Sequence, residues 1–138
     1  MKLSRTVAYA VHATLQLAQT DSGAPVPCSQ LAAEGSMPER FLLQILRNLV
    51  THGILHSTRG VEGGYSLERK PDEISLLEVI EAIDGPLVAT LPIPDGDHSA
   101  TYDSRLRDVL EQVAANSRRL LGAVKLSDLL TGRLPKLA

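Results

Sequence analysis

The chain has 138 residues, of which 43% are hydrophobic and 22% charged, and its formal net charge is −2. This length suits one domain that buries a core without covalent cross-links. Three tyrosines, one phenylalanine, no tryptophan and one cysteine exclude an aromatic stacking platform, a disulfide framework, a cysteine-based zinc site, and an iron–sulfur cluster held by the chain's own thiolates alone.

The charge is unevenly distributed along the chain. Residues 1–70 carry seven Lys or Arg against five Asp or Glu, and residues 71–138 carry seven against eleven. A basic front half fits an anionic partner. The apolar run at residues 7–18 is interrupted by polar side chains without a cleavage site after it, and no stretch is long enough to span a bilayer. We therefore expect a cytoplasmic protein without a membrane partner.

The first helix is predicted from apolar residues at positions 3, 7, 11, 15 and 18, which recur at steps of three and four. Ser4 is its expected N-cap, and the turn-forming residues 21–27 end it. A short second helix is predicted over residues 28–34.

The third helix is expected to begin at a Ser-x-x-Glu capping signature formed by Ser36 and Glu39, with Pro38 in its first turn. It is predicted to run to about His52, where Gly53 ends it. The second and third helices are thus joined by a tight turn.

Two β-prone runs follow, at residues 54–59 and 65–68, around the glycine-rich turn 60–64. This pattern predicts a hairpin. A second capping signature, formed by Ser75 and Glu78, then opens a fourth helix that ends before the next glycine.

A long helix is predicted over residues 102–122 and a short one near residues 127–130. The order of elements is typical of a mainly α protein with a small β-hairpin, namely a winged helix-turn-helix followed by a long C-terminal helix. We expect a DNA-binding domain at residues 1–85 and a loop at 86–101. Residues 102–138 then form a dimerisation helix and a short helix that packs on the N-terminal domain.

The third helix separates an apolar face from a polar one on a helical wheel. The apolar face predicts a core made of Phe41, Leu42, Ile45, Leu46 and Leu49. The polar face carries Arg40, Gln44, Arg47 and Thr51. Arginine can hydrogen-bond guanine bidentately and glutamine can do so with adenine. An ordinary solvated face is the alternative, but the position between a tight turn and a wing favours reading of a major groove.

Arg59 precedes the glycine-rich turn of the predicted wing, between Thr58 and Gly60. At this place its guanidinium is expected to enter a minor groove, whose negative potential attracts it. The alternative is a surface ion pair with Glu62.

Side chains at the starts of the first two helices are candidate phosphate clamps, because helix N-termini bind phosphate. These side chains are Lys2, Ser4, Arg5, Ser29 and Gln30. The alternative for each of them is an ordinary surface position.

The long helix carries apolar residues seven apart, at Leu106, Val113 and Leu120. The second seam of this repeat holds Val109, Leu110, Ser117 and Val124. Such a stripe suits a partner helix packed lengthwise, and packing within the same chain is the alternative. We expect a homodimer that selects a palindromic DNA site. The expected interface is Tyr102, Leu106, Val109, Leu110, Val113 and Leu120.

Two residues are candidate sensors. Cys28 lies in the first turn of the second helix, where the helix dipole lowers a thiol pKa and favours oxidation; the alternative is a small apolar filler. His12 lies on the flank of the first helix, as an interface histidine or a ligand. A further set of possible metal ligands consists of Asp95, Asp97, His98 and Asp103. This set lacks the bidentate glutamate of a calcium-binding loop, and we therefore assign no metal site to it.

No catalytic residues are assigned. The chain has neither a nucleophile elbow around a serine nor a glycine-rich loop followed by a phosphate-binding lysine. We therefore expect a protein that is not an enzyme.

Four segments are similar to sequences of one known family, namely MKLSRTVAYAVHATLQLA, MPERFLLQILRNLVTHGIL, RGVEGGYSL and ISLLEVIEAIDG. They resemble the Rrf-two family of bacterial transcription regulators, which includes the iron–sulfur cluster regulator and the nitric-oxide-sensing repressor. The resemblance covers nearly the whole chain. It implies a homodimeric winged-helix regulator that binds double-stranded DNA and dimerises through its long C-terminal helix.

The resemblance also implies which residues contact DNA. In similar proteins the third helix reads the major groove, here with Arg40, Phe41 and Gln44, and a wing arginine, here Arg59, reaches the minor groove. Leu43 stands where the cluster regulator has a glutamate that tunes sequence choice, so that a different target site is expected. The complete expected set is Lys2, Ser4, Arg5, Ser29, Gln30, Met37, Pro38, Arg40, Phe41, Gln44, Arg47, Thr58, Arg59 and Gly60.

The largest departure from the resemblance concerns the cofactor. Cluster-binding relatives place three cysteines between the fourth helix and the long helix, and this sequence has none there. Some relatives use a histidine of the first helix as a cluster ligand, at a place similar to His12. Without the cysteines we expect no iron–sulfur cluster and no other cofactor. Sensing through a thiol, here Cys28, or through a partner protein is compatible with the resemblance.

The expected function is that of a bacterial transcriptional repressor that binds a palindromic promoter site as a homodimer. One alternative is a winged helix used as a protein-interaction module. Another is a regulator that senses a small ligand or a redox signal through Cys28 or His12.

Overall fold

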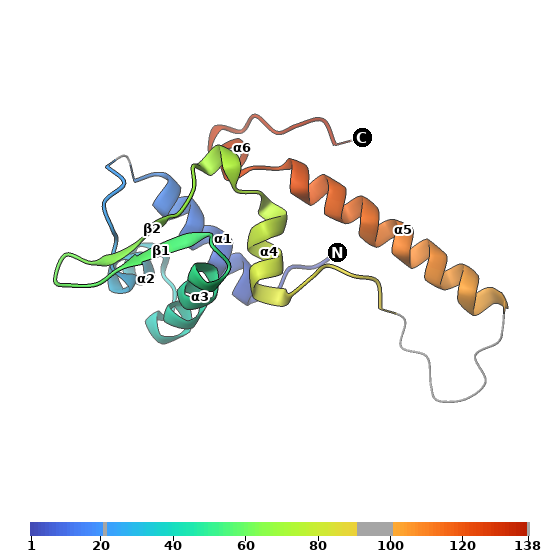
Figure 1. Cartoon of the computed structure of the whole chain (residues 1–138), viewed down its shortest axis with the longest axis horizontal. Coiled ribbons are helices and arrows are strands. Elements are labelled where there is room, and N and C mark those ends of the chain that lie inside the picture. The colour runs from blue at the N-terminus through green and yellow to red at the C-terminus, as the bar shows by residue number, and fades with distance from the viewer. Residues whose placement is uncertain (21, 91–100, 138) are drawn as a thin grey trace.

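The computed structural model describes residues 1–20, 22–90 and 101–137 of the chain. Its elements are α1 (Arg5–Ala18), α2 (Cys28–Gly35), α3 (Glu39–Thr51), β1 (Leu55–Thr58), β2 (Gly64–Leu67), the 3₁₀ helix η1 (Pro71–Glu73), α4 (Leu76–Asp84), α5 (Thr101–Ala123) and α6 (Leu126–Thr131). The predicted class, mainly α with one β-hairpin in a winged helix-turn-helix, is confirmed (Figure 1).

Two of the predicted helix starts are confirmed by their hydrogen bonds. The Ser4 hydroxyl accepts a bond of 3.1 Å from the backbone N–H of Val7 at the start of α1. At the start of α4, Ser75 Oγ accepts from the N–H of Glu78 at 3.1 Å, and the Glu78 carboxylate accepts from the N–H of Ser75 at 2.8 Å. This reciprocal box satisfies two backbone donors that the first turn of a helix leaves free.

The predicted capping role of Ser36 is wrong. Ser36 ends α2 in a left-handed conformation with φ of 53°, and Pro38 is the N-cap of α3, without a side-chain hydrogen bond. A tight turn between two helices requires one residue with positive φ, whereas an N-cap needs extended backbone. Ser36 occupies the turn position, and the bond from Met37 N to Ala32 O at 2.9 Å closes the turn.

The core lies where α1, α3 and α4 pack against one another, with β1 and α6 at its edges. Its large side chains that are almost fully buried include Val7, Leu31, Leu42, Ile45, Leu46, Leu49, Ile54, Leu55, Ile74, Val79 and Leu126. Burial of each aliphatic side chain of this kind contributes about 2 kcal/mol before the cost of ordering the chain. This core fixes α3 between α1 and the hairpin, so that one face of α3 stays at the surface.

The hairpin is tied to the segment before α2. Its strands are antiparallel, with Leu55 opposite Leu67 and Thr58 opposite Gly64. Backbone bonds of 2.9 Å and 2.8 Å join Val26 to Tyr65 in both directions. The backbone of Gly64 passes so close to this bridge that an added Cβ would lie 2.4 Å from the carbonyl of Val26. The wing is therefore held to the body by backbone contacts that leave no room for a side chain at this glycine.

Helix α5 extends away from the rest of the molecule, and only its C-terminal part lies beside α4 (Figure 1). There Arg118 forms an ion pair with Glu81, whose carboxylate also accepts a bond of 2.7 Å from the N–H of Leu87. Val124 follows α5 and is buried, with its carbonyl bound to the N–H of Leu76 at 2.8 Å. Its predicted place on the second seam of the long helix is therefore wrong, because the helix ends before it.

Helix α6 packs against α1 and η1, and Leu126 at its start is completely buried in the core. Among the residues that the structure describes, no helix combines the length and the apolar character needed to cross a bilayer.

Candidate nucleic-acid interface

Helix α3 presents a polar face to solvent. Leu42, Ile45, Leu46 and Leu49 are buried beneath it. Arg40, Gln44, Arg47 and Thr51 are exposed. Because the buried side chains occupy a single stripe, α3 cannot rotate about its own axis without exposing them. The row of exposed side chains is therefore held toward solvent. The division into two faces that the sequence predicts is therefore confirmed for these eight residues.

Phe41 departs from that division. The helical wheel predicts it in the core, whereas the resemblance implies a DNA contact, and 55% of its surface is exposed. Counted along α3, Phe41 lies about 90° from the centre of the buried stripe, at the flank of the polar face. Met37, in contrast, is buried with 7% of its surface exposed. Its side chain therefore packs under the turn between α2 and α3 and is not presented for contact with a ligand.

Three exposed arginines of α3 and the hairpin have no ion-pair partner among the described residues. Within the described residues, the ion pairs involve His56 with Glu68, Arg69 with Glu78, and Arg118 with Glu81. None of them involves Arg40, Arg47 or Arg59, and the alternative pair of Arg59 with Glu62 is not formed. Unpaired guanidinium groups on one surface are suited to phosphates and to guanine edges.

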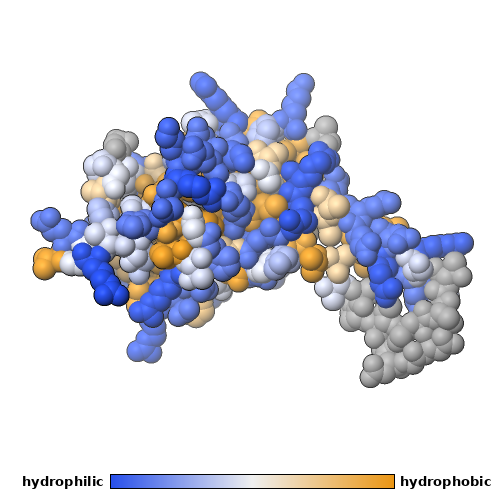
Figure 2. Space-filling view, viewed as in Figure 1, coloured by the Kyte–Doolittle hydropathy of each residue, from blue (hydrophilic) through white to orange (hydrophobic). Residues whose placement is uncertain are grey.

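The hairpin presents its turn to solvent. Thr58, Arg59 and Gly60 are all exposed, and a bond of 3.0 Å from Gly63 N to Gly60 O closes the turn. Val61 at the tip is fully exposed, which the sequence analysis did not single out. An apolar residue within the glycine-rich run 60–64 is the signal that identifies it. In Figure 2, which is viewed as Figure 1, apolar surface marks the tip of the hairpin at the left.

The starts of α1 and α2 carry the candidate phosphate clamps. Lys2, Ser4, Arg5, Ser29 and Gln30 are all exposed. Neither helix has an acidic residue in its first turn, so that the positive ends of both helix dipoles are not offset there. Two of the side chains have structural partners as well, since Ser4 caps α1 and Gln30 donates to Glu34 Oε1 at 3.0 Å. Pro38 is exposed at the start of α3.

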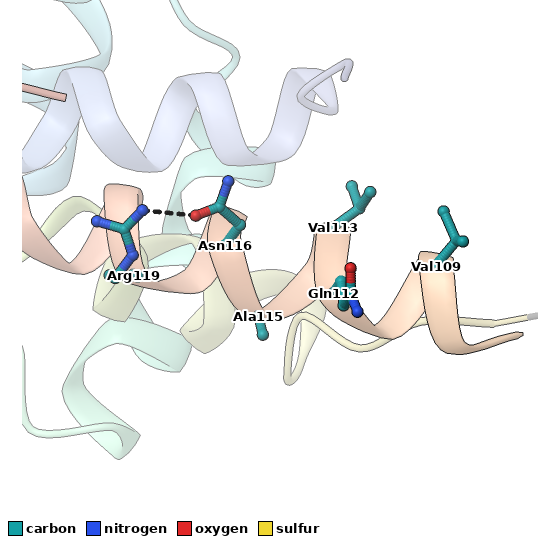
Figure 3. Close-up of a pocket in the computed structure, with 6 residues that line it drawn as sticks. All are labelled: Val109, Gln112, Val113, Ala115, Asn116 and Arg119. Carbon is teal, nitrogen blue, oxygen red and sulfur yellow. Dashed lines mark hydrogen bonds between the residues drawn. The ribbon is translucent and has the colours of Figure 1, made fainter. Parts of the chain in front are cut away.

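Helix α5 has an apolar face that the described residues leave largely exposed. Its exposed members are Tyr102, Leu106, Val109 and Val113, of which 47% to 74% is exposed. Leu110 and Leu120, from the same predicted interface, are half-buried. Figure 3 shows Val109 and Val113 on one side of α5 and Ala115 on the opposite side. An open groove of about 550 Å³ runs along the helix past Val109, Val113 and Asn116.

Of the two candidate sensor residues, Cys28 lies in an environment that differs from the expected one. Partial burial and the nearby carboxylate of Glu39 raise the pKa of the Cys28 thiol above its ordinary value. The thiol lies 3.7 Å from the backbone oxygen of Glu39, to which it donates. The lowered pKa expected from the helix dipole is therefore wrong, because burial and the carboxylate oppose it. His12 is exposed on α1.

Nearly the whole chain matches a known family model. The model of the Rrf2 family, described as an iron-dependent transcriptional regulator, covers residues 3–132. A Mycobacterium tuberculosis protein named as an HTH-type transcriptional regulator is 40% identical over 137 residues, which are 99% of this chain and 85% of that protein.

An iron centre does not fit the residues present. Cys28 is the only cysteine of the chain, and it lies under the start of α3 rather than beside α5. Across residues 1–20, 22–90 and 101–137, no three His, Cys, Asp or Glu side chains come together as metal ligands would. Asp95, Asp97 and His98 of the predicted loop lie outside the described residues.

Solved structures show the same fold. CymR, the global cysteine regulator of B. subtilis, is 23% identical and superposes with a TM-score of 0.78 over 96% of this chain and 98% of its own. IscR of T. potens is 27% identical, with a TM-score of 0.75 over 96% of this chain and 88% of its own. These relatives are regulators rather than enzymes. The chain belongs to the Rrf2 family and is a DNA-binding transcriptional regulator of the helix-turn-helix type.

Proposed function

We propose that the protein is a homodimeric repressor that binds a palindromic promoter site through α3 and the hairpin. The observation that carries this proposal is a set of exposed arginines without an ion-pair partner among the described residues, namely Arg40 and Arg47 on α3 and Arg59 on the adjoining hairpin. Guanidinium groups without acidic partners remain available to an anionic ligand, and a polyanion such as DNA binds them with release of its counterions.

Each element of this surface has a separate task. Arg40, Gln44 and Arg47 project from the exposed face of α3 and read base edges in the major groove, arginine at guanine and glutamine at adenine. Arg59 extends from the wing into the flanking minor groove. Phosphate and backbone contacts that set the register come from Lys2, Ser4, Arg5, Ser29, Gln30, Pro38, Thr58 and Gly60. Met37 contributes by filling the space under the turn.

Dimerisation follows from the uncovered face of α5. Tyr102, Leu106, Val109 and Val113 expose apolar surface in a repeat that a second α5 can cover lengthwise. A two-fold axis along this contact places two copies of α3 about one turn of DNA apart, roughly 34 Å, and selects a palindrome. Occupation of such a site within a promoter excludes RNA polymerase, which is repression.

The proposed repressor works without an iron–sulfur cluster, since its one cysteine lies in α2 and is partly buried beneath α3. The absorption spectrum of anaerobically purified protein tests this directly. We expect no visible absorption band, and a band with matching iron content would contradict the assignment.

The function is tested with DNA fragments that the protein retrieves from its own genome. Arg59→Ala and Gln44→Ala should each weaken binding about tenfold in fluorescence anisotropy, with unchanged circular dichroism, because each removes a base contact from an exposed position. Arg133→Ala removes an exposed arginine outside the proposed surface and should leave the affinity unchanged. Wild-type affinity in both test variants would contradict the assignment of these elements to DNA.

A further inference from the structure

Phe41 is an apolar group within a polar reading face. It is the single phenylalanine of the chain, lies in the first turn of α3, and has 55% of its surface exposed. Its neighbours on the exposed side are Arg40 and Gln44, which carry hydrogen-bond donors. An aromatic ring left half in water gives up part of the burial energy that other apolar residues of α3 obtain. The ring therefore contributes little to the core of the monomer.

The major groove offers one apolar group at the edge of a base pair, the 5-methyl group of thymine. The other groups there are hydrogen-bond donors and acceptors, which Arg40 and Gln44 can satisfy and Phe41 cannot. The resemblance implies that Phe41 contacts DNA but not what it recognises there. We propose that its target is a thymine methyl group in each half-site, which makes Phe41 a specificity-determining residue. This inference rests on the proposed function, since it requires α3 to lie in the major groove.

The place of Phe41 on α3 limits which thymine it can contact. Phe41 follows Arg40 directly and precedes Gln44 by three residues, so that the three side chains leave the helix within one turn. A base pair reached by Phe41 is then next to one reached by Arg40 or Gln44. We expect the thymine beside a guanine or adenine that these polar side chains read.

The hairpin supplies an internal control. Val61 is also apolar and fully exposed, but it stands at the tip of the wing, next to the turn that follows Arg59. A side chain entering the minor groove meets no thymine methyl group, because the methyl lies in the major groove. Val61 and Phe41 are therefore both exposed and apolar, but only Phe41 is in a position to contact a thymine methyl group.

The test replaces thymine by deoxyuridine, which removes the methyl group and keeps all base-pair hydrogen bonds. Each thymine of the retrieved site is replaced in turn, in both half-sites, and the affinity of the full chain is measured. Wild-type protein should lose about fourfold per methyl group at one thymine of each half-site, and little elsewhere. Phe41→Ala should bind the thymine and deoxyuridine sites equally, and Val61→Ala should keep the wild-type difference.

The outcomes separate this inference from the proposed function. Specific binding by wild type without any loss on deoxyuridine replacement would overturn the role of Phe41 and leave DNA binding intact. Retention of the difference in Phe41→Ala would overturn it as well. Failure to retrieve any specific DNA would instead contradict the proposed function. Phe41→Leu keeps an apolar side chain and should retain part of the difference in affinity between the thymine and deoxyuridine sites. It provides a second test if the alanine variant is poorly folded.

Discussion

At the scale of single residues, the wing depends on a glycine that has no room for a side chain. Gly64 has φ of 149°, in the region that favours glycine, and an added Cβ would lie 2.4 Å from the backbone of Val26. The added Cβ would clash with backbone atoms of Val26, which cannot turn aside as the end of a flexible side chain could. Gly60, in the same hairpin, has φ of 114° and no atom within 4 Å of an added Cβ.

Gly64→Ala should therefore lower the free energy of unfolding by about 3 kcal/mol, through backbone strain and the clash together. Gly60→Ala, which introduces strain without a clash, should cost about 1 to 2 kcal/mol. Urea unfolding followed by circular dichroism measures both. Equal losses in the two variants would show that the close approach at Val26 does not hold the wing.

Cys28 gives a prediction about reactivity. Because burial and Glu39 raise its pKa, its thiolate is scarcer near neutral pH than that of an unperturbed thiol. Iodoacetamide should therefore alkylate Cys28 in the folded protein more slowly at pH 7.5 than in urea-unfolded chains, as followed by mass spectrometry. Faster alkylation of the folded protein would indicate an activated thiol.

Single residues also show which features of the site the sequence could predict and which it could not. The polar row of α3 was predictable, because a helical wheel places Arg40 and Gln44 opposite the buried leucines. The same wheel was wrong for Phe41, since hydropathy places an aromatic residue inside; only the family resemblance implied that this residue is available to DNA. Ser36 illustrates a second limit. Its capping signature was present in the sequence, but the tight turn between two helices imposed a left-handed backbone there.

At the scale of elements, the capping box of α4 couples helix stability to pH. Partial burial alone raises the pKa of Glu78, but bonds from the backbone of Ser75 and from Arg69 outweigh it, and the pKa is lowered overall. The Arg69 guanidinium lies 2.5 Å from the carboxylate. A lowered folded-state pKa stabilises the protein above the unfolded pKa, near 4.5, and this contribution disappears as the pH falls through the folded-state value.

Glu78→Gln should therefore destabilise the protein at pH 7 by about 0.5 to 1 kcal/mol, a figure reduced for the partial exposure of the pair. The difference from wild type should shrink as the pH falls from about 5 to 3. Thermal unfolding across this range measures it. Glu73→Gln, at a neighbouring exposed carboxylate, should show a smaller effect. A difference that grows toward acid pH would contradict the assigned sign.

The boundaries of the elements were largely predictable, because local signals set them. Ser4, Ser75 and Gly85 mark the same helix ends in the sequence and in the structure. The 3₁₀ helix η1 was missed, since its three residues carry no periodic pattern. The ion pair of Arg118 with Glu81 was missed too, because residues 37 positions apart meet only after α5 folds back on α4.

At the scale of the whole molecule, the exposed apolar face of α5 is the surface through which we propose that the protein dimerises. Val113 is 58% exposed on a helix that extends away from the core. Val113→Glu places a charge in the proposed contact and should shift the protein to monomers in sedimentation velocity at about 10 µM. DNA affinity should fall about tenfold or more, since one half-site contact no longer assists the other.

Ser104→Glu is the matched control, because Ser104 is exposed on α5 about 180° around the helix from Val113 and does not line the groove beside Val113. It adds the same charge to the same helix and should leave the protein dimeric. Monomers in both variants would indicate that charge on α5, rather than the apolar contact, decides assembly.

The central claim is that two copies of α3 and the wing read a palindrome. Hydroxyl-radical footprinting of the full chain on the promoter of a gene that it regulates tests this most directly. We predict two symmetric protected segments centred about one helical turn apart, with minor-groove protection at their outer edges that disappears in Arg59→Ala. A single protected segment, or protection that Arg59→Ala leaves unchanged, would contradict the account.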